Sequence, residues 1–170
     1  MKPILYFLGS FIAFVLLSLT SAIAQAPLEV KLTVESVGPR TVESRTEQSL
    51  VRDYTAAWKN LAEASETSSP SLLDAYFVGG AKATFAHELL DQQKTGTHVR
   101  YLNQIHNLKA VFYAPEGDVM QLQDSAEYQM QIVSDGKVVH DEHVVVQYIV
   151  LMTPGADRWT IRQLQAVPAS

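Results

Sequence analysis

The sequence of 170 residues contains no cysteine. A disulfide framework, a thiolate zinc site, an iron–sulfur cluster and a cysteine nucleophile are therefore all excluded. Basic residues are also few, with 13 Lys and Arg against 18 Asp and Glu, a net charge of −5 and a pI near 5.5. Because no basic patch stands out, nucleic acid is not an expected partner. With 47% hydrophobic and 18% charged residues, the chain has the composition of a globular domain.

The N-terminus is unlike the rest of the chain. Lys2 precedes an apolar run from Ile4 to Leu19, and small residues follow and end in Ala22-Ile23-Ala24. This pattern predicts a secretory signal peptide over residues 1–24, cleaved after Ala24 to leave Gln25 as the new N-terminus. Cleavage removes one lysine and no acid, so the mature chain is one charge unit more negative.

The alternative is that the same apolar segment is kept as a membrane anchor, since its length is about enough to cross a ~30 Å hydrocarbon core. A membrane is an expected partner only in that case. No second run of ~18 apolar residues follows, so both alternatives predict an extracytoplasmic domain, periplasmic or secreted.

Hydrophobic spacing after the signal segment predicts one short strand and then three helices. Alternating apolar residues predict a strand over 28–35. A helix is expected over 45–64, behind a capping box formed by Ser44 and Glu47. A second helix begins at Pro70 and a third ends near Lys94.

From residue 101 onward the pattern changes to strands rich in Val, Ile, Tyr and Phe. The expected strands are Tyr101–Tyr113, Val119–Ser134, Lys137–Thr153 and Arg158–Val167. Turn residues such as Asp135-Gly136 connect them, so they form three successive hairpins. Strands of this length must bend, and a bent sheet wraps helices. The sequence therefore predicts an α+β fold, with N-terminal helices packed on the concave face of a long, bent antiparallel meander sheet.

Three helices followed by long strands, the last beginning Arg158-Trp159-Thr160-Ile161, resemble the nuclear transport factor 2-like superfamily, which includes ketosteroid isomerase and SnoaL-like cyclases. The resemblance covers residues 45–167 and implies a cone-shaped domain over 45–168, preceded by a strand and linker over 25–44. Within that superfamily, Tyr101–Leu108 and Asp141-Glu142 look similar to interaction domains of plastid division proteins. Superfamily members often dimerise through their sheets.

In such a cone the pocket lies between the first helix and the concave sheet face. His106 is a polar residue on a strand side that Leu102, Leu108, Ala110 and Phe112 are expected to share, and it could act as a base or hydrogen-bond donor. The alternative is a histidine at the rim of the core, satisfied by a backbone carbonyl. Asp124 has the parity of the inward residues of the next strand and is the leading acid candidate.

The sequence also supplies enough aromatic residues to line a pocket, where hydroxyl or indole groups could orient a ligand. Core packing is the alternative role for these side chains. The candidates are Tyr54, Trp58, Tyr76, Phe77, Tyr101, Tyr128 and Tyr148.

No metal site or cofactor is expected. His140 and His143 differ by an odd number and so project from opposite faces of a strand. His87 and Asp91 form a helical i, i+4 pair that offers too few ligands. The sequence lacks the G-x-S-x-G, Walker A and G-x-G-x-x-G motifs of familiar hydrolases, P-loop proteins and dinucleotide enzymes.

Two functions remain open. The first is an exported, non-enzymatic domain that binds a small apolar molecule or a protein partner. The second is a proton-transfer enzyme of the isomerase, cyclase or dehydratase type, with His106 or Asp124 as base and Tyr54 or Tyr128 as hydrogen-bond donor.

The strand over 137–153 has apolar residues on both faces, which indicates burial on both sides. Either the strand over 28–35 covers Val145 and Ile149 on its outer face, or a second molecule does. Because dimerisation through the sheet is common in the superfamily, the resemblance favours a homodimer.

Overall fold

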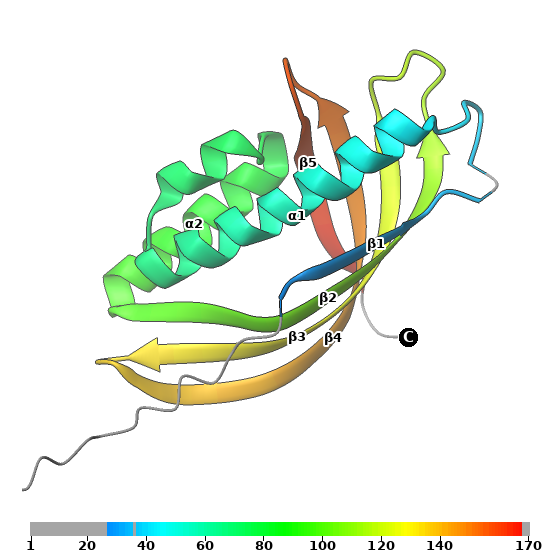
Figure 1. The fold of residues 1–170 in the computed structure, drawn as a ribbon. Coiled ribbons are helices and arrows are strands. Elements are labelled where there is room, and N and C mark those ends of the chain that lie inside the picture. The colour runs from blue at the N-terminus through cyan, green and yellow to red at the C-terminus, as the bar shows by residue number, and fades with distance from the viewer. Residues whose placement is uncertain (1–26, 36, 168–170) are drawn as a thin grey trace, which may run out of the picture.

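The computed structural model describes residues 27–35 and 37–167, an α+β arrangement in which helices lie inside a curved sheet (Figure 1). Strand β1 (Glu29–Thr33) comes first, followed by helix α1 (Ser44–Thr67), the 3-10 helix η1 (Pro70–Ala75) and helix α2 (Gly79–Thr95). Strands β2 (Thr97–Tyr113), β3 (Met120–Ser134), β4 (Lys137–Pro154) and β5 (Trp159–Val167) complete the chain. The predicted fold class is confirmed.

The N-terminal segment, with its predicted cleavage site after Ala24, lies outside the described residues. Within the part of the chain that the structure describes, no helix is both long and apolar enough to cross a membrane.

The sheet order is β1-β2-β3-β4-β5, and the last four strands form the predicted antiparallel meander. At the β3–β4 hairpin, Asp135 and Gly136 both have positive φ values, 51° and 73°, as a two-residue type I′ turn requires. Register shifts interrupt the pairing within β2, near Ile132 and near Leu151. Such bulges bend long strands, and they let the sheet curve around the helices.

Helix α1 buries the predicted apolar stripe against the sheet. Its fully buried side chains include Leu50, Tyr54, Trp58 and Leu61. The predicted capping box is wrong, because the helix begins one residue earlier and Glu43, not Ser44, is the N-cap. The Glu43 carboxylate instead accepts a hydrogen bond from the Thr46 hydroxyl at 3.2 Å.

The predicted second helix is only the short 3-10 turn η1, so Tyr76 and Phe77 lie beyond it. Helix α2 starts at Gly79, whose φ of +55° suits glycine. A Cβ atom there would lie 3.2 Å from the Arg162 side chain on β5, so glycine also allows this close approach.

A buried carboxylate fastens α1 to the last strand. Asp53 is 1% exposed, and its Oδ2 accepts a hydrogen bond from the backbone N–H of Trp159 at 2.7 Å. Its Oδ1 accepts a second bond from Arg52 Nε at 2.8 Å. This contact spans 106 residues of sequence and sets how α1 crosses the sheet.

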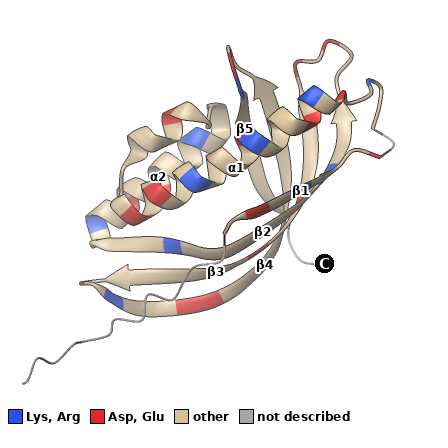
Figure 2. Cartoon of the chain, viewed as in Figure 1, with Lys and Arg blue, Asp and Glu red and all other residues tan. Residues whose placement is uncertain are grey.

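The strand predicted over 28–35 does not cover the outer face of β4, so this alternative to a homodimer is wrong. Strand β1 instead pairs in parallel with β2, Glu29 opposite Ile105, and extends the sheet at its edge. The outer face of β4 therefore stays open, with Val145 73% exposed. From His143 to Pro154 this strand carries no Asp, Glu, Lys or Arg (Figure 2).

Replacement of Asp53 by alanine is expected to lower the free energy of unfolding by about 1–3 kcal/mol, because the buried Trp159 N–H loses its acceptor. Urea denaturation measures this change. The control is Asp74→Ala, which removes a solvent-exposed ion pair with Lys82 and should have little effect. Equal losses in the two variants would contradict the role of Asp53.

Because β1 leaves the outer face of β4 open, the prediction that remains is that a second copy of the chain covers this face. Light scattering on the concentrated protein is expected to give twice the chain mass, and Val145→Lys is expected to lower it to the monomer mass. A monomer mass for the unaltered protein at high concentration would contradict the dimer.

Candidate ligand-binding site on the concave face

Three polar side chains that the sequence analysis selected meet inside the domain. Tyr54 Oη on α1 donates a hydrogen bond to Asp124 Oδ2 on β3 at 2.7 Å. His106 Nδ1 on β2 lies 2.7 Å from the same oxygen. Because the acceptor is a carboxylate, Nδ1 carries the proton and donates. All three residues are 0% exposed, so they form a closed polar cluster.

The partner of His106 is thus a carboxylate, and the expected backbone carbonyl at the core rim is wrong. The parity of Asp124 had correctly placed it inward. The pattern of one strand does not show how the neighbouring strand pairs with it. In the structure Leu108 of β2 lies opposite Asp124 of β3, and this alignment brings His106 within hydrogen-bond distance of Asp124.

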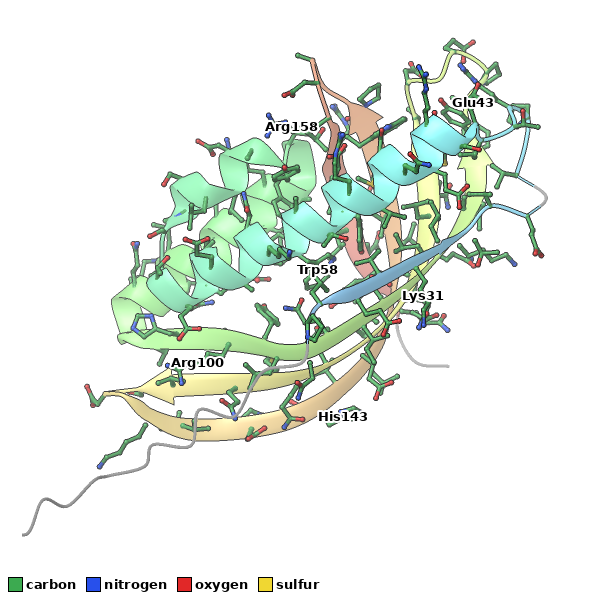
Figure 3. The ribbon with its side chains drawn as sticks, in the orientation of Figure 1. Lys31, Glu43, Trp58, Arg100, His143 and Arg158 are labelled. Carbon is green, nitrogen blue, oxygen red and sulfur yellow. The ribbon has the colours of Figure 1, made fainter. Side chains whose placement is uncertain are left out.

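Trp58 lies one turn after Tyr54 on α1, between this helix and the sheet (Figure 3), and packs against His106. Its ring centroid lies 4.3 Å from that of His106, with 38° between the ring planes. Three buried polar atoms here have no hydrogen-bond partner in the described protein: Trp58 Nε1, His106 Nε2 and Asp124 Oδ1. Buried polar atoms are normally paired, so this cluster is unusual for a region that serves packing alone.

A bulge in β2 decides which residues share the face of His106. The pairing with β3 shifts between Leu102 and Ile105, and Asn103 has a φ of +52°. As a result Tyr101 faces inward with His106, although the two differ by an odd number. The expectation that Leu102 shares this face is wrong, because it pairs with outward Gln129.

The second shift, between Ala110 and Phe112, has the same effect at the other end of β2. It turns Phe112 outward, where the side chain is 40% exposed. The expectation for Phe112 is therefore also wrong, whereas Leu108 and Ala110 are buried on the inner face as expected.

Three tyrosines surround Trp58 on the inner side of the sheet. The ring centroids of Tyr101, Tyr128 and Tyr148 each lie 6.1 Å from that of Trp58. The hydroxyl groups of Tyr128 and Tyr148 are 2.9 Å apart and share a hydrogen bond. Tyr101 and Tyr148 are only half-buried, so this aromatic set extends from the closed cluster toward solvent.

Burial keeps these phenols protonated, and the Asp124 carboxylate adds to the effect on Tyr54, Tyr128 and Tyr148. Burial raises the pKa of Tyr54 well above its usual value near 10, and the charge of Asp124 raises it further. Burial likewise raises the pKa of Tyr101, Tyr128 and Tyr148. All four phenols therefore act as neutral hydrogen-bonding groups around neutral pH.

Half-buried aliphatic side chains continue the aromatic set along β3 and β4. Together they form the concave apolar surface, which comprises Tyr101, Met130, Val144, Val146 and Tyr148. The sequence analysis missed Met130, Val144 and Val146 as site residues. Their alternation was visible, but core residues have the same pattern.

Two of the aromatic candidates lie elsewhere. The Tyr76 ring is stacked under the Arg158 guanidinium at 5.2 Å. Phe77 is 1% exposed and packs on Phe85 of α2 at 5.3 Å between ring centroids. Neither belongs to the set around Trp58, so the expectation that they line the same pocket is wrong.

The histidines outside the cluster form exposed pairs. His140 Nε2 lies 3.2 Å from Glu142 and His143 Nε2 lies 3.3 Å from Glu127. His87 shares Asp91 with Lys94. Among the described residues no three His, Asp or Glu side chains are placed to hold one metal ion.

Two cavities lie near the domain edges, away from the cluster. One of about 400 Å³ opens between the start of α2 and β5 near Arg162. Another, of about 290 Å³, is lined by Leu28, Lys59 and Tyr101 at the β2 bulge. Neither cavity is lined by Tyr54, His106 or Asp124.

No family model matches the chain, and no curated protein matches it. Its structure is similar to the crystal structure of the intermembrane space region of the chloroplast protein ARC6, with a TM-score of 0.62 and 12% sequence identity. The match covers 77% of this chain and 100% of that one. At this identity the similarity shows the fold alone.

The raised pKa of the buried tyrosines makes stability sensitive to alkaline pH. The folded state keeps protons that the unfolded chain releases near pH 10, so the stabilisation is complete below pH 10 and is lost as the pH rises further. Tyr54 alone is expected to contribute a loss of about 1.4 kcal/mol per pH unit. Urea denaturation between pH 8 and 11.5 should show this slope, and Tyr54→Phe should reduce it. An unchanged slope in that variant would be inconsistent with a buried, protonated Tyr54.

Proposed function

We propose that this chain is an exported, non-enzymatic domain of the nuclear transport factor 2-like superfamily that binds a small apolar ligand on its concave face. The observation that carries the proposal is the concave apolar surface, which stays partly open to solvent beside a closed polar cluster. The order of helices and strands supports the superfamily, and the N-terminal segment supports export.

The chemistry of this surface suits a small ligand with an apolar body. Met130, Val144 and Val146 offer flexible and branched aliphatic contacts. The hydroxyl pair of Tyr128 and Tyr148 can orient one polar group of the ligand. Pockets of this kind combine a mostly apolar lining with a few placed polar groups.

Its position favours a small molecule over a folded protein partner. Helices α1 and α2 lie over the inner side of the sheet, so this surface is at the inside of the curve (Figure 1). A folded partner meets the outside of a domain more readily than the inside of a curved sheet. A protein segment as occupant is one outcome of the test below.

Proton-transfer catalysis is the second candidate, because Tyr54, His106 and Asp124 share hydrogen bonds as a catalytic base and its donors would. A base must reach the proton that it removes. All three side chains are 0% exposed, and Asp124 Oδ2 already accepts two hydrogen bonds. This closure favours binding over catalysis.

The binding proposal is tested with 1-octanol, a neutral apolar probe, by isothermal titration calorimetry. Val146→Asn is expected to weaken octanol binding roughly tenfold, because it places a polar group on the concave apolar surface. Val145→Asn is the matched control, since this neighbour points outward and is 73% exposed. Circular dichroism checks that both variants fold.

Absence of octanol binding to the unaltered protein would overturn the proposal. Equal weakening in both variants would place the site elsewhere. If octanol fails to bind and a hydrophobic peptide binds in a manner sensitive to Val146→Asn, the occupant is a protein segment instead.

A further inference from the structure

One long edge of strand β4 has no neighbouring strand in the described chain. Strand β4 pairs with β3 from Lys137 onward, but its pairing with β5 begins only at Gln147. The isolated bridges found among the described residues involve β2 and β5, not β4. Residues 137–146 therefore form a free edge (Figure 1), and one row of their backbone N–H and C=O groups has no strand to pair with.

This free edge has little of the protection that edge strands usually carry. Natural edges avoid pairing with other chains by being short, or by carrying proline, lysine or a bulge. Here the edge is long and contains no proline, and its lysine and its register shift both lie at one end. Val138, Val139 and Val145 on it are 47%, 62% and 73% exposed. Branched side chains favour strand pairing, so the free edge is suited to receive a further strand.

The charged residues of the free edge are complementary to a second copy of the same edge. They are consecutive, His140 to His143, with two acids between the histidines and valines on both sides. When two copies of one strand pair antiparallel about a two-fold axis, each residue lies opposite the partner residue equally far beyond the axis. With the axis at Glu142, Asp141 lies opposite the partner's His143, and the symmetry forms this pair twice.

Asp141 and His143 keep the capacity for this contact. The Asp141 carboxylate accepts hydrogen bonds from Gln129 and Gln131, and a carboxylate has about four acceptor positions. His143 approaches Glu127 with Nε2 at 3.3 Å, and its Nδ1 has no partner in the described chain. The pair across the axis therefore forms without breaking either existing contact.

The extent of the free edge selects the same axis. Glu142 is near its middle, so pairing about Glu142 joins residues 138–146 of the two copies and stops where β5 begins at Gln147. Val139 then lies beside the partner's Val145, which covers exposed valines of both copies. The two Glu142 carboxylates meet at the axis, where each accepts a hydrogen bond from its own His140 Nε2 at 3.2 Å.

The outer face of the sheet is less suited to a second copy than this edge. The outward apolar residues of β4 have polar neighbours on β3. Those opposite Val145, Ile149 and Leu151 are Glu127, Gln123 and Gln121. Stacking two sheets would bury these polar groups together with the apolar ones, and burial without partners is unfavourable. Edge pairing leaves Gln121 and Gln123 in water.

We propose that two copies of this chain join along the free edge of β4, antiparallel and about a two-fold axis at Glu142, so that one sheet runs through both. The second copy that the sequence predicts over Val145 thus meets the chain at this edge and does not stack sheet on sheet. Backbone groups of residues 138–146 gain partners, and the concave apolar surfaces of the two copies stay open. The inference does not depend on any ligand.

The absence of cysteine allows a direct test by cross-linking. Glu142→Cys places one thiol on each side of the axis, where opposite Cα atoms are about 4.5–5.5 Å apart and a disulfide can form. After oxidation with copper phenanthroline, a non-reducing gel is expected to show most of this variant at twice the chain mass. The matched control is Gln123→Cys, exposed on β3 and far from the axis, which should stay at the monomer mass. Circular dichroism checks that both variants fold.

Hydrogen exchange of the unaltered protein gives a second readout. Backbone amides of residues 138–146 that point to the free edge are expected to exchange at least about tenfold more slowly in concentrated than in dilute protein. Amides of β3, which lies between two strands at every concentration, should exchange at an unchanged rate and serve as the control.

Each outcome decides the inference. Cross-linking of Glu142→Cys alone, together with concentration-dependent protection of the free edge, supports it. No cross-linking of Glu142→Cys, or equal cross-linking of both variants, overturns it. Cross-linking of Gln123→Cys alone would indicate stacked sheets and also overturns it, as would exchange at the free edge that does not change with concentration.

Discussion

One carboxylate oxygen holds the helical layer in place over the sheet. Asp124 Oδ2 accepts hydrogen bonds from Tyr54 on α1 and His106 on β2, groups separated from it by 70 and 18 residues of sequence. Since both bonds are buried, a shift of α1 along or around its axis would deprive the Asp124 carboxylate of its Tyr54 donor. Trp58, one turn along α1, is thereby held over His106, and the three tyrosines pack around it. The whole concave face depends on this arrangement.

Such a cluster is not the most stabilising way to fill a core. Removing a carboxylate from water costs several kcal/mol, and apolar residues of similar volume often stabilise a fold as well or better. Here Asp124 makes both of its hydrogen bonds through one oxygen and leaves Oδ1 unpaired. The cluster instead fixes the position of Trp58, around which Tyr101, Tyr128 and Tyr148 pack.

Local patterns predicted the elements well, because spacing and turn chemistry are local. The apolar stripe of α1, the four long strands and the Asp135-Gly136 turn all follow from neighbouring residues. The errors arise where a feature has no local signature. Asn103 in a left-handed conformation shifts the pairing of β2 and turns Leu102 outward, which no count of parity along one strand can reveal.

The remaining misses have the same origin. The alignment of β2 on β3 supplies His106 with its carboxylate, and that alignment is a long-range property. Strand β1 is five residues long, and it pairs with the edge strand β2. The alternation of apolar and polar residues in β1 would fit packing on the outer face of the sheet equally well.

Strand β4 shows how a single run of apolar residues can serve two surfaces. Val144, Val146 and Tyr148 face the helices, whereas Val145, Ile149 and Leu151 face outward. His143 marks the outer side (Figure 3), where it pairs with Glu127. Because successive side chains project from opposite faces, the inner residues can adapt to a ligand while the outer ones adapt to a protein surface. The apolar character of both faces therefore needs two separate explanations, and the concave one follows from the polar cluster that Asp124 organises.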